Sequence, residues 1–193
     1  MKTLIFDCET TGLPKDWKAK MKDLDNWPRV IQLAWVLYGE DQKLIKKGCD
    51  LIKPDGWTMP TDKFWIDNGF SQGQSEKDGI PIIKALKGFT KAIEESDYLV
   101  AHNMSFDHNV VGAEFLRAKL SSKNKPIKIC TKEKSTDFCK IRTSYGKYKW
   151  PKLEELHKKL FGKTFDGAHD ALADVEACGR CFFELVNRGV IKI

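Results

Sequence analysis

A short apolar run that ends in two closely spaced acids constrains this chain more than any other feature. The run from Thr3 to Phe6 is apolar and β-branched enough for a buried strand, and Asp7 and Glu9 follow it. Alternate residues of a strand point to the same face, so these two carboxylates project side by side. Two like charges about 4 Å apart cost roughly 4 kcal/mol at an effective dielectric near 20. The pair therefore requires protonation, solvent or cations, and a divalent metal ion is the useful answer.

The composition indicates a globular protein with a polyanionic partner. The 193 residues are 41% hydrophobic and 31% charged, which fits a single domain spanning residues 1–193. The formal net charge of +6 comes from lysine-rich segments over loops and helices. An acidic centre in a basic protein suits phosphodiesters as substrates.

The chain shows neither a signal peptide nor a segment long enough to span a membrane, so we expect a cytoplasmic protein without a membrane partner. Its six cysteines lack the spacing of a disulfide framework and are expected to be reduced and mostly buried. The single pair formed by Cys178 and Cys181 is poor evidence for zinc or redox chemistry. Cys8 is expected to face away from Asp7 and Glu9 and is not counted as a ligand.

The order of the predicted elements indicates an α/β fold. Residues 30–38 and 43–53 read as a hairpin that joins the first strand in a three-stranded antiparallel sheet. Shorter strands at residues 98–101 and 127–131 alternate with helices, which implies a mixed sheet with helices on its faces. The predicted helices are residues 81–93, 105–120, 136–141, 151–162 and 170–187.

No catalytic role is expected for two aromatic and two imidazole side chains. A short helix is expected from Thr61 to Asn68, and for its Phe64 and Trp65 we favour a place in the core over stacking on bases. His108 and His157 match no motif and are expected to be surface or capping residues.

Further acids fall at junctions of separate elements. Asp107 lies in the first turn of the helix after strand 98–101, and Asp174 lies off the apolar stripe of the last helix. Each also has a simpler interpretation, since Asp107 can stabilise its helix dipole and Asp174 can face solvent. His169 can be an ordinary residue before the last helix, with Asp170 as the cap.

Three motifs carry a resemblance to a known family. The first is residues 6–12, Phe-Asp-Cys-Glu-Thr-Thr-Gly; the second is residues 102–107, His-Asn-Met-Ser-Phe-Asp; the third is His169 followed five residues later by Asp174. In this order they resemble the motifs of the DnaQ-like, or DEDDh, 3′-to-5′ exonucleases. The resemblance covers nearly the whole chain and implies a ribonuclease H-like fold, with three antiparallel strands, then parallel strands, and helices on both faces.

The resemblance also implies the chemistry of the site. It implies that Asp7, Glu9, Asp107 and Asp174 hold two divalent cations, Mg²⁺ or Mn²⁺, and that His169 is the general base. Hard oxygen ligands suit these ions, and an imidazole with an ordinary pKa near 6.5 can accept a proton at neutral pH. For His102, a structural role is favoured over catalysis.

Residues that hold the terminal nucleotide are implied by the same resemblance. They are residues at the end of the first motif or just after it and two residues of the second, namely Thr10, Thr11, Leu13, Asn103 and Phe106. Phe106 fits a core position under the site equally well.

The function that we expect is metal-dependent 3′-to-5′ hydrolysis at nucleic-acid 3′ ends, releasing nucleoside 5′-monophosphates. Single-stranded DNA is the preferred substrate, in proofreading or end trimming, and a polymerase is a candidate partner. One alternative is a 3′-to-5′ exoribonuclease, because nothing in the sequence separates ribose from deoxyribose. Another is a catalytically silent nucleic-acid-binding module of the same fold.

Overall fold

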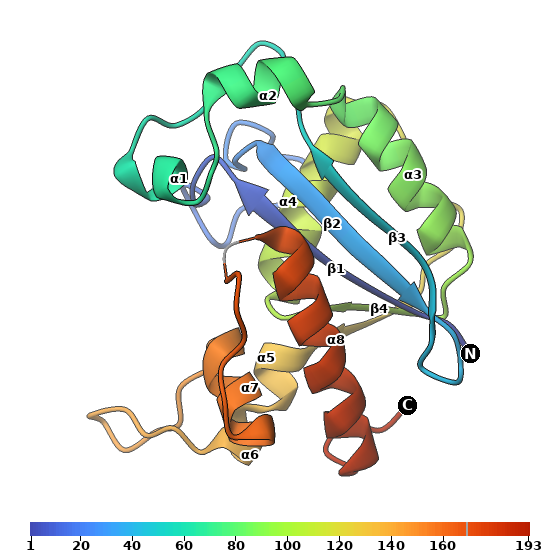
Figure 1. Ribbon diagram of the computed structural model, residues 1–193, viewed down its shortest axis with the longest axis vertical. Coiled ribbons are helices and arrows are strands. Elements are labelled where there is room, and N and C mark those ends of the chain that lie inside the picture. Colours follow the sequence, from blue (N-terminus) through green and yellow to red (C-terminus); the bar gives the residue numbers. More distant parts are fainter. Residues whose placement is uncertain (169) are drawn as a thin grey trace.

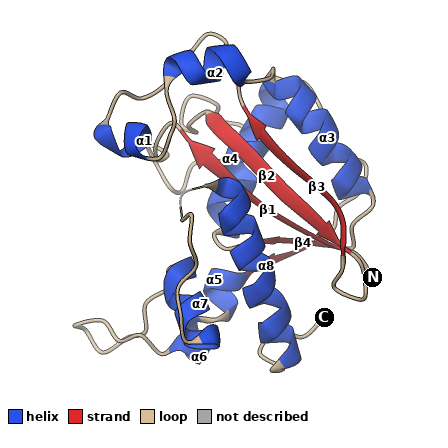
Figure 2. Cartoon of the chain, viewed as in Figure 1, coloured by secondary structure: helices blue, strands red, loops and turns tan. Residues whose placement is uncertain are grey.

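The centre of the protein is a mixed sheet of five strands, shown in red in Figure 2. The computed structural model describes residues 1–168 and 170–193. Strand order in the sheet is β3-β2-β1-β4-β5, with β1 antiparallel to β2 and parallel to β4. The strands are β1 (Thr3–Thr10), β2 (Val30–Tyr38), β3 (Leu44–Leu51), β4 (Tyr98–Ala101) and β5 (Ile127–Cys130).

Helices cover both faces of this sheet (Figure 1). The long helices are α3 (Ile82–Glu94) and α4 (Met104–Arg117), which share one hydrophobic core, and α8 (Ala171–Asn187), which shares the other with α7 (Leu153–Phe161). The short helices are α1 (Lys63–Asp67), α2 (Gln72–Asp78), α5 (Thr131–Lys134) and α6 (Thr136–Cys139).

Alternation along β1 divides the two cores. Leu4 and Phe6 face α3, where the Phe6 ring lies 5.2 Å from that of Phe89, whereas Ile5 packs with Val175 and Phe182 of α8. Because both faces are buried, side chains with odd numbers in β1 point toward α8. The strand runs on to Thr10, so Asp7 and Glu9 belong to it and share the face of Ile5.

A buried ion pair fixes the long connection between β1 and β2. Glu114 of α4 is 1% exposed and accepts hydrogen bonds from Arg29 Nε at 2.7 Å and Arg117 Nη1 at 2.9 Å. Arg117 also donates to the carbonyl oxygens of Leu24 and Trp27. Burying a carboxylate is favourable only when it is paired and hydrogen-bonded, so this network ties the connection to α4 beside the end of β1.

The mixed sheet with helices on both faces confirms the fold class indicated by the sequence, but several local predictions were incomplete or wrong. Helices α2 and α5 were not predicted. The preference for a core position was wrong for Phe64, which is 46% exposed, while Trp65 is half-buried beside Phe70. Across the described part of the chain, every helix is too short or too polar to cross a bilayer. The cysteines are free thiols, and all but Cys49 are buried.

We predict that Gly48→Ala destabilises the sheet. A Cβ added at Gly48 would lie 2.6 Å from Nε1 and Cε2 of Trp35, which packs across the neighbouring strand. Overpacking of this kind typically costs about 1–3 kcal/mol, to be measured as the change in free energy of unfolding by urea denaturation. Gly88→Ala in α3 is the matched control, because a Cβ there meets no described atom within 4 Å and is expected to stabilise the helix by roughly 0.5–1 kcal/mol. Equal effects of the two substitutions would contradict the packing argument.

Candidate active site

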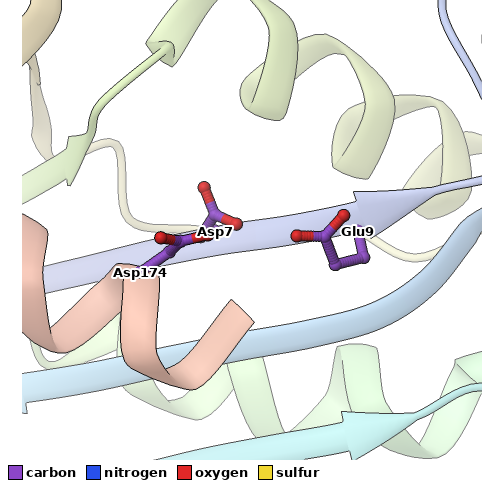
Figure 3. A group of neighbouring side chains, drawn as sticks. All are labelled: Asp7, Glu9 and Asp174. Carbon is purple, nitrogen blue, oxygen red and sulfur yellow. The ribbon is translucent and has the colours of Figure 1, made fainter. Parts of the chain in front are cut away.

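Three carboxylates from two elements meet at the end of the central strand. Asp7 and Glu9 are half-buried on the face of β1 that meets α8, and Asp174 lies in the first turn of α8. One oxygen from each can be chosen so that all three lie within 4.8 Å of one another. Figure 3 shows the strand supplying two of these groups and the helix supplying the third. Oxygens at such separations can share one divalent cation.

A fourth carboxylate approaches from the other side of β1. Asp107, in the first turn of α4, is 2% exposed, and its Oδ1 accepts a hydrogen bond from the Cys8 thiol at 3.5 Å. Its Oδ2 is buried without a hydrogen-bond partner among the described residues. A buried acceptor left unsatisfied is costly, and a cation or a proton would satisfy it.

The four acids line one pocket of about 340 Å³. This volume lies within the range of small-molecule sites. The other lining residues come from β1, from the start of α4 and the loop before it, from the start of α7 and from the connection between α7 and α8: Cys8, His102, Asn103, Phe106, Lys152, Leu153, Glu154, Phe165 and Ala168. The structure thus brings together Asp7, Glu9, Asp107 and Asp174 with Asn103 and Phe106 from the second motif.

Burial and mutual repulsion raise the pKa values of these acids. Burial first, and then the charges of Asp107, Asp174 and Glu9, raise the pKa of Asp7 well above its ordinary value. Burial, followed by the charges of Asp174 and Asp107, raises the pKa of Glu9 to about 8. Burial raises the pKa of Asp107 to about 7, although the hydrogen bond from Cys8 acts in the opposite direction. Without cations, the pocket therefore favours protonated acids near neutral pH.

Gln32 of β2 orients the start of α8. It pairs with Glu9 across the two strands, and its Oε1 accepts a hydrogen bond from the backbone N–H of Ala171 at 2.9 Å. Its Nε2 donates to Asp170, whose other oxygen caps the helix by accepting from Leu172 N and Ala173 N. These bonds occupy N–H groups that the first helical turn leaves open. They set the helix position from which Asp174 reaches the two acids of β1.

His169, the predicted general base, lies outside the described residues, so its role stays a prediction. The connection that precedes it is held by His157, which is 4% exposed. Its Nδ1 donates to the carbonyl oxygen of Lys163 at 2.8 Å, and its Nε2 accepts from Arg180 at 3.4 Å. The His157 ring also lies 5.4 Å from that of Phe165, which lines the pocket. The expectation of a surface or capping role for His157 was therefore wrong.

His102 is held by two protein oxygens. Its Nδ1 lies 2.9 Å from Thr131 Oγ1, and its Nε2 lies 3.0 Å from the carbonyl oxygen of Pro151. Burial lowers the pKa of His102 to about 4, so the ring is neutral at physiological pH. These contacts join the second motif to the start of α7, as a structural role requires.

Three residues at the end of the first motif or just after it lie outside the pocket lining. Thr10 is 5% exposed and donates its hydroxyl hydrogen bond to Gly12 O, while Thr11 Oγ1 accepts from Arg29 N. Leu13 is 72% exposed and remains available to a ligand beyond the pocket. Substrate roles for Thr10, Thr11 and Leu13 stay predictions.

The sequence did not point to part of the pocket lining. Lys152, Leu153 and Glu154 line the pocket at the start of α7, and Phe165 adds an aromatic ring. The Pro-Lys-Leu start of a helix only indicates a helix terminus, so nothing in the local sequence signals proximity to β1. The bond between His102 and Pro151 creates that proximity.

The mixed sheet and the helices on both of its faces define a ribonuclease H-like fold, with an acidic pocket at the end of its central strand. A family model described as Exonuclease matches residues 4–182. The chain therefore belongs to the exonuclease family, and its DnaQ-like motifs lie within the matched region.

Curated relatives with similar sequences are named DNA polymerase III PolC-type. The protein from Streptococcus pyogenes serotype M2 (strain MGAS10270) is 31% identical over 180 residues, covering 93% of this chain and 11% of that protein. The one from Streptococcus pyogenes serotype M1 is 36% identical over 180 residues, with the same coverage of 93% and 11%. The chain thus spans about a tenth of these relatives.

Solved structures with the same fold are named exonuclease I. The E. coli protein in complex with a dT13 oligonucleotide aligns with a TM-score of 0.73 and 18% identity, over 96% of this chain and 41% of that chain. The exonuclease I from Methylocaldum szegediense aligns with a TM-score of 0.73 and 18% identity, over 97% and 40%. At these identities the likeness concerns the fold.

We predict that the metal-free protein loses stability as the pH rises from about 7 to 8.5. Glu9, with its pKa raised from 4.5 to about 8, keeps its proton in the folded state but not in the unfolded state, so deprotonation favours unfolding. One pKa unit corresponds to about 1.4 kcal/mol, so we expect a loss of roughly 1 kcal/mol in urea unfolding with EDTA. Above pH 7 the titration of His102 contributes little, because its imidazole is then mostly neutral in the folded state and in the unfolded state.

Glu9→Gln is the control for this prediction, because the amide cannot titrate. We expect a clearly flatter dependence of stability on pH in this variant. A wild type whose stability is constant or rises over this interval would contradict the assigned electrostatics.

Proposed function

We propose that this protein is a divalent-metal-dependent 3′-to-5′ exonuclease that removes nucleoside 5′-monophosphates from single-stranded DNA ends. The observation that carries the proposal is the convergence of four carboxylates on one pocket, with three of them within 4.8 Å. Membership of the exonuclease family supplies the reaction class, which is hydrolysis of a phosphodiester bond.

The donor set fits two hard divalent cations. Asp7, Glu9 and Asp174 would hold the first, and Asp107, whose Oδ2 is buried without a hydrogen-bond partner among the described residues, would contribute a ligand to the second. Carboxylate oxygens are the ligands that Mg²⁺ and Mn²⁺ prefer, and cations would replace the protons that burial otherwise favours. When bound, such a pair of ions supplies a water activated at neutral pH and charge stabilisation for the departing 3′-oxygen.

The protein groups bind the nucleotide and move the proton. We assign proton acceptance from the attacking water to an imidazole nitrogen of His169, on the strength of its motif. Asn103 offers a polar contact and Phe106 an apolar surface to the terminal nucleotide, since both line the pocket. The ammonium group of Lys152 can offset the charge of the scissile phosphate.

Single-stranded DNA is the favoured substrate for two reasons. A similar fold has been solved with a dT13 oligonucleotide, and the relatives in sequence carry the name of a DNA polymerase. The second reason also makes a polymerase a candidate partner. Ribose and deoxyribose differ by one hydroxyl, so RNA is the competing substrate that the assay must include.

The first test is digestion of 5′-labelled single-stranded DNA and RNA with Mg²⁺, Mn²⁺ or EDTA. We expect a ladder that shortens from the 3′ end, requires the metal, and forms faster on DNA. Asp174→Asn removes one anionic ligand and is expected to lower the rate by at least about 10²-fold. Glu176→Gln is the matched control on the same helix, because Glu176 pairs with Lys47 away from the pocket. Activity in EDTA, or an Asp174→Asn variant as fast as wild type, would refute the mechanism.

A second substitution separates proton transfer from metal binding. His169→Ala is expected to retain the Mn²⁺ affinity of the wild type while losing about 10²- to 10⁴-fold in turnover, since general-base help is commonly worth that much. Calorimetric titration with Mn²⁺ and single-turnover cleavage measure the two effects. Lost Mn²⁺ affinity would make His169 a ligand instead.

A further inference from the structure

A basic hairpin projects from the protein beside the candidate active site. It comprises residues 141–149 and leaves the body next to α6 and α7 (Figure 1). The two arms are joined by backbone hydrogen bonds from Lys149 N to Ile141 O at 2.9 Å and from Thr143 N to Lys147 O at 2.8 Å. Gly146 supplies the left-handed conformation of the turn, with φ of +77°. The hairpin therefore has a defined shape.

Positive charge and exposed aromatic rings are concentrated on this hairpin and the residues that follow it. The segment 142–152 contains no acidic residue, and its basic residues are Arg142, Lys147, Lys149 and Lys152. Tyr145 at the tip is 91% exposed, Tyr148 is 39% exposed and Trp150 is 60% exposed. Lys149 is committed to both oxygens of Glu155 at 2.7 Å, whereas Arg142 and Lys147 extend into solvent.

The base of the hairpin is connected to the pocket by direct contacts. The Lys132 ammonium lies 4.8 Å from the centroid of the Trp150 ring and also donates a hydrogen bond to Asn103 Oδ1. Asn103 lines the pocket, and so does Lys152, two residues after Trp150. Trp150 therefore lies at the rim, and a chain leaving the pocket on this side would meet the hairpin.

We propose that the basic hairpin binds the single-stranded polynucleotide upstream of its 3′ end. Tyr145 and Tyr148 offer rings on which bases stack without sequence preference, and Arg142 and Lys147 neutralise phosphates. Proteins that bind single-stranded nucleic acids commonly combine aromatic rings with cationic side chains in this way. This inference rests on the proposed function, since it assigns the part of the same substrate that lies outside the pocket.

The test compares a long substrate with one that cannot reach the hairpin. The long substrates are labelled oligothymidylate and oligouridylate, and the short one is the p-nitrophenyl ester of thymidine 5′-monophosphate. For Tyr145→Ala combined with Tyr148→Ala, we expect kcat/KM on the oligonucleotides to fall at least about tenfold. Hydrolysis of the ester should stay within about twofold of wild type, because neither tyrosine lines the pocket.

A charge variant tests the phosphate contacts separately. With Arg142→Gln and Lys147→Gln combined, the slope of log affinity against log salt should fall by about 1.4, since each contact to a single strand contributes about 0.7. Affinity is measured by fluorescence anisotropy in EDTA, which prevents cleavage. Lys87→Gln combined with Lys91→Gln removes the same charge from the exposed side of α3 and should leave the slope nearly unchanged.

The outcomes separate the two proposals. Variants that bind and cut oligonucleotides like the wild type, or that lose as much on the ester as on the oligonucleotides, would overturn the hairpin assignment. A wild type that hydrolyses neither kind of substrate would overturn the proposed function, and the anisotropy measurements would then decide the hairpin assignment alone. Equal losses on the two polymers would support recognition of features common to DNA and RNA.

Discussion

Repulsion among four carboxylates at the end of β1 is the constraint on which the rest of the structure depends. Asp7 and Glu9 project from one strand, while α8 and α4 add Asp174 and Asp107 from opposite sides. Burial and mutual repulsion raise the pKa of Glu9 to about 8. Without cations, the folded protein must therefore either keep protons on these carboxyl groups or bear the repulsion between their charges. Divalent cations would stabilise an arrangement so unfavourable by itself, which supports the proposed metal-dependent phosphodiester chemistry.

Polar contacts outside the acidic group keep its members at these positions. Gln32 links β2 to the N-terminus of α8, and the Cys8 thiol holds one oxygen of Asp107. The pairing of Glu114 with Arg29 fixes the connection that leaves the end of β1. Each of these bonds joins segments far apart in the sequence, so the site depends on the complete sheet and on helices from both faces.

The strongest periodic signals in the sequence were sufficient for much of the fold. A nearly continuous apolar run identified β2, the turn after it indicated the hairpin, and the apolar stripe of the last helix indicated the side of α8 that packs in the core. Spacing within the motifs identified the four acids from the sequence, and the structure brings them to one pocket. Helix α2 escaped prediction because its sequence is almost entirely polar, with Ser75 as its buried residue. The burial of His157 was equally unreadable, because its partners come from separate segments whose contact depends on tertiary packing.

Titration of the metal-free wild type with Mn²⁺ at alkaline pH, in the presence of a nucleoside 5′-monophosphate, would show whether these carboxylates form a cation site. Calorimetry or the electron paramagnetic resonance signal of free Mn²⁺ gives the number of ions bound. We expect saturable binding of two ions per chain and the loss of this binding in Asp7→Asn. Absence of saturable binding by the wild type, or unchanged binding by the variant, would contradict it.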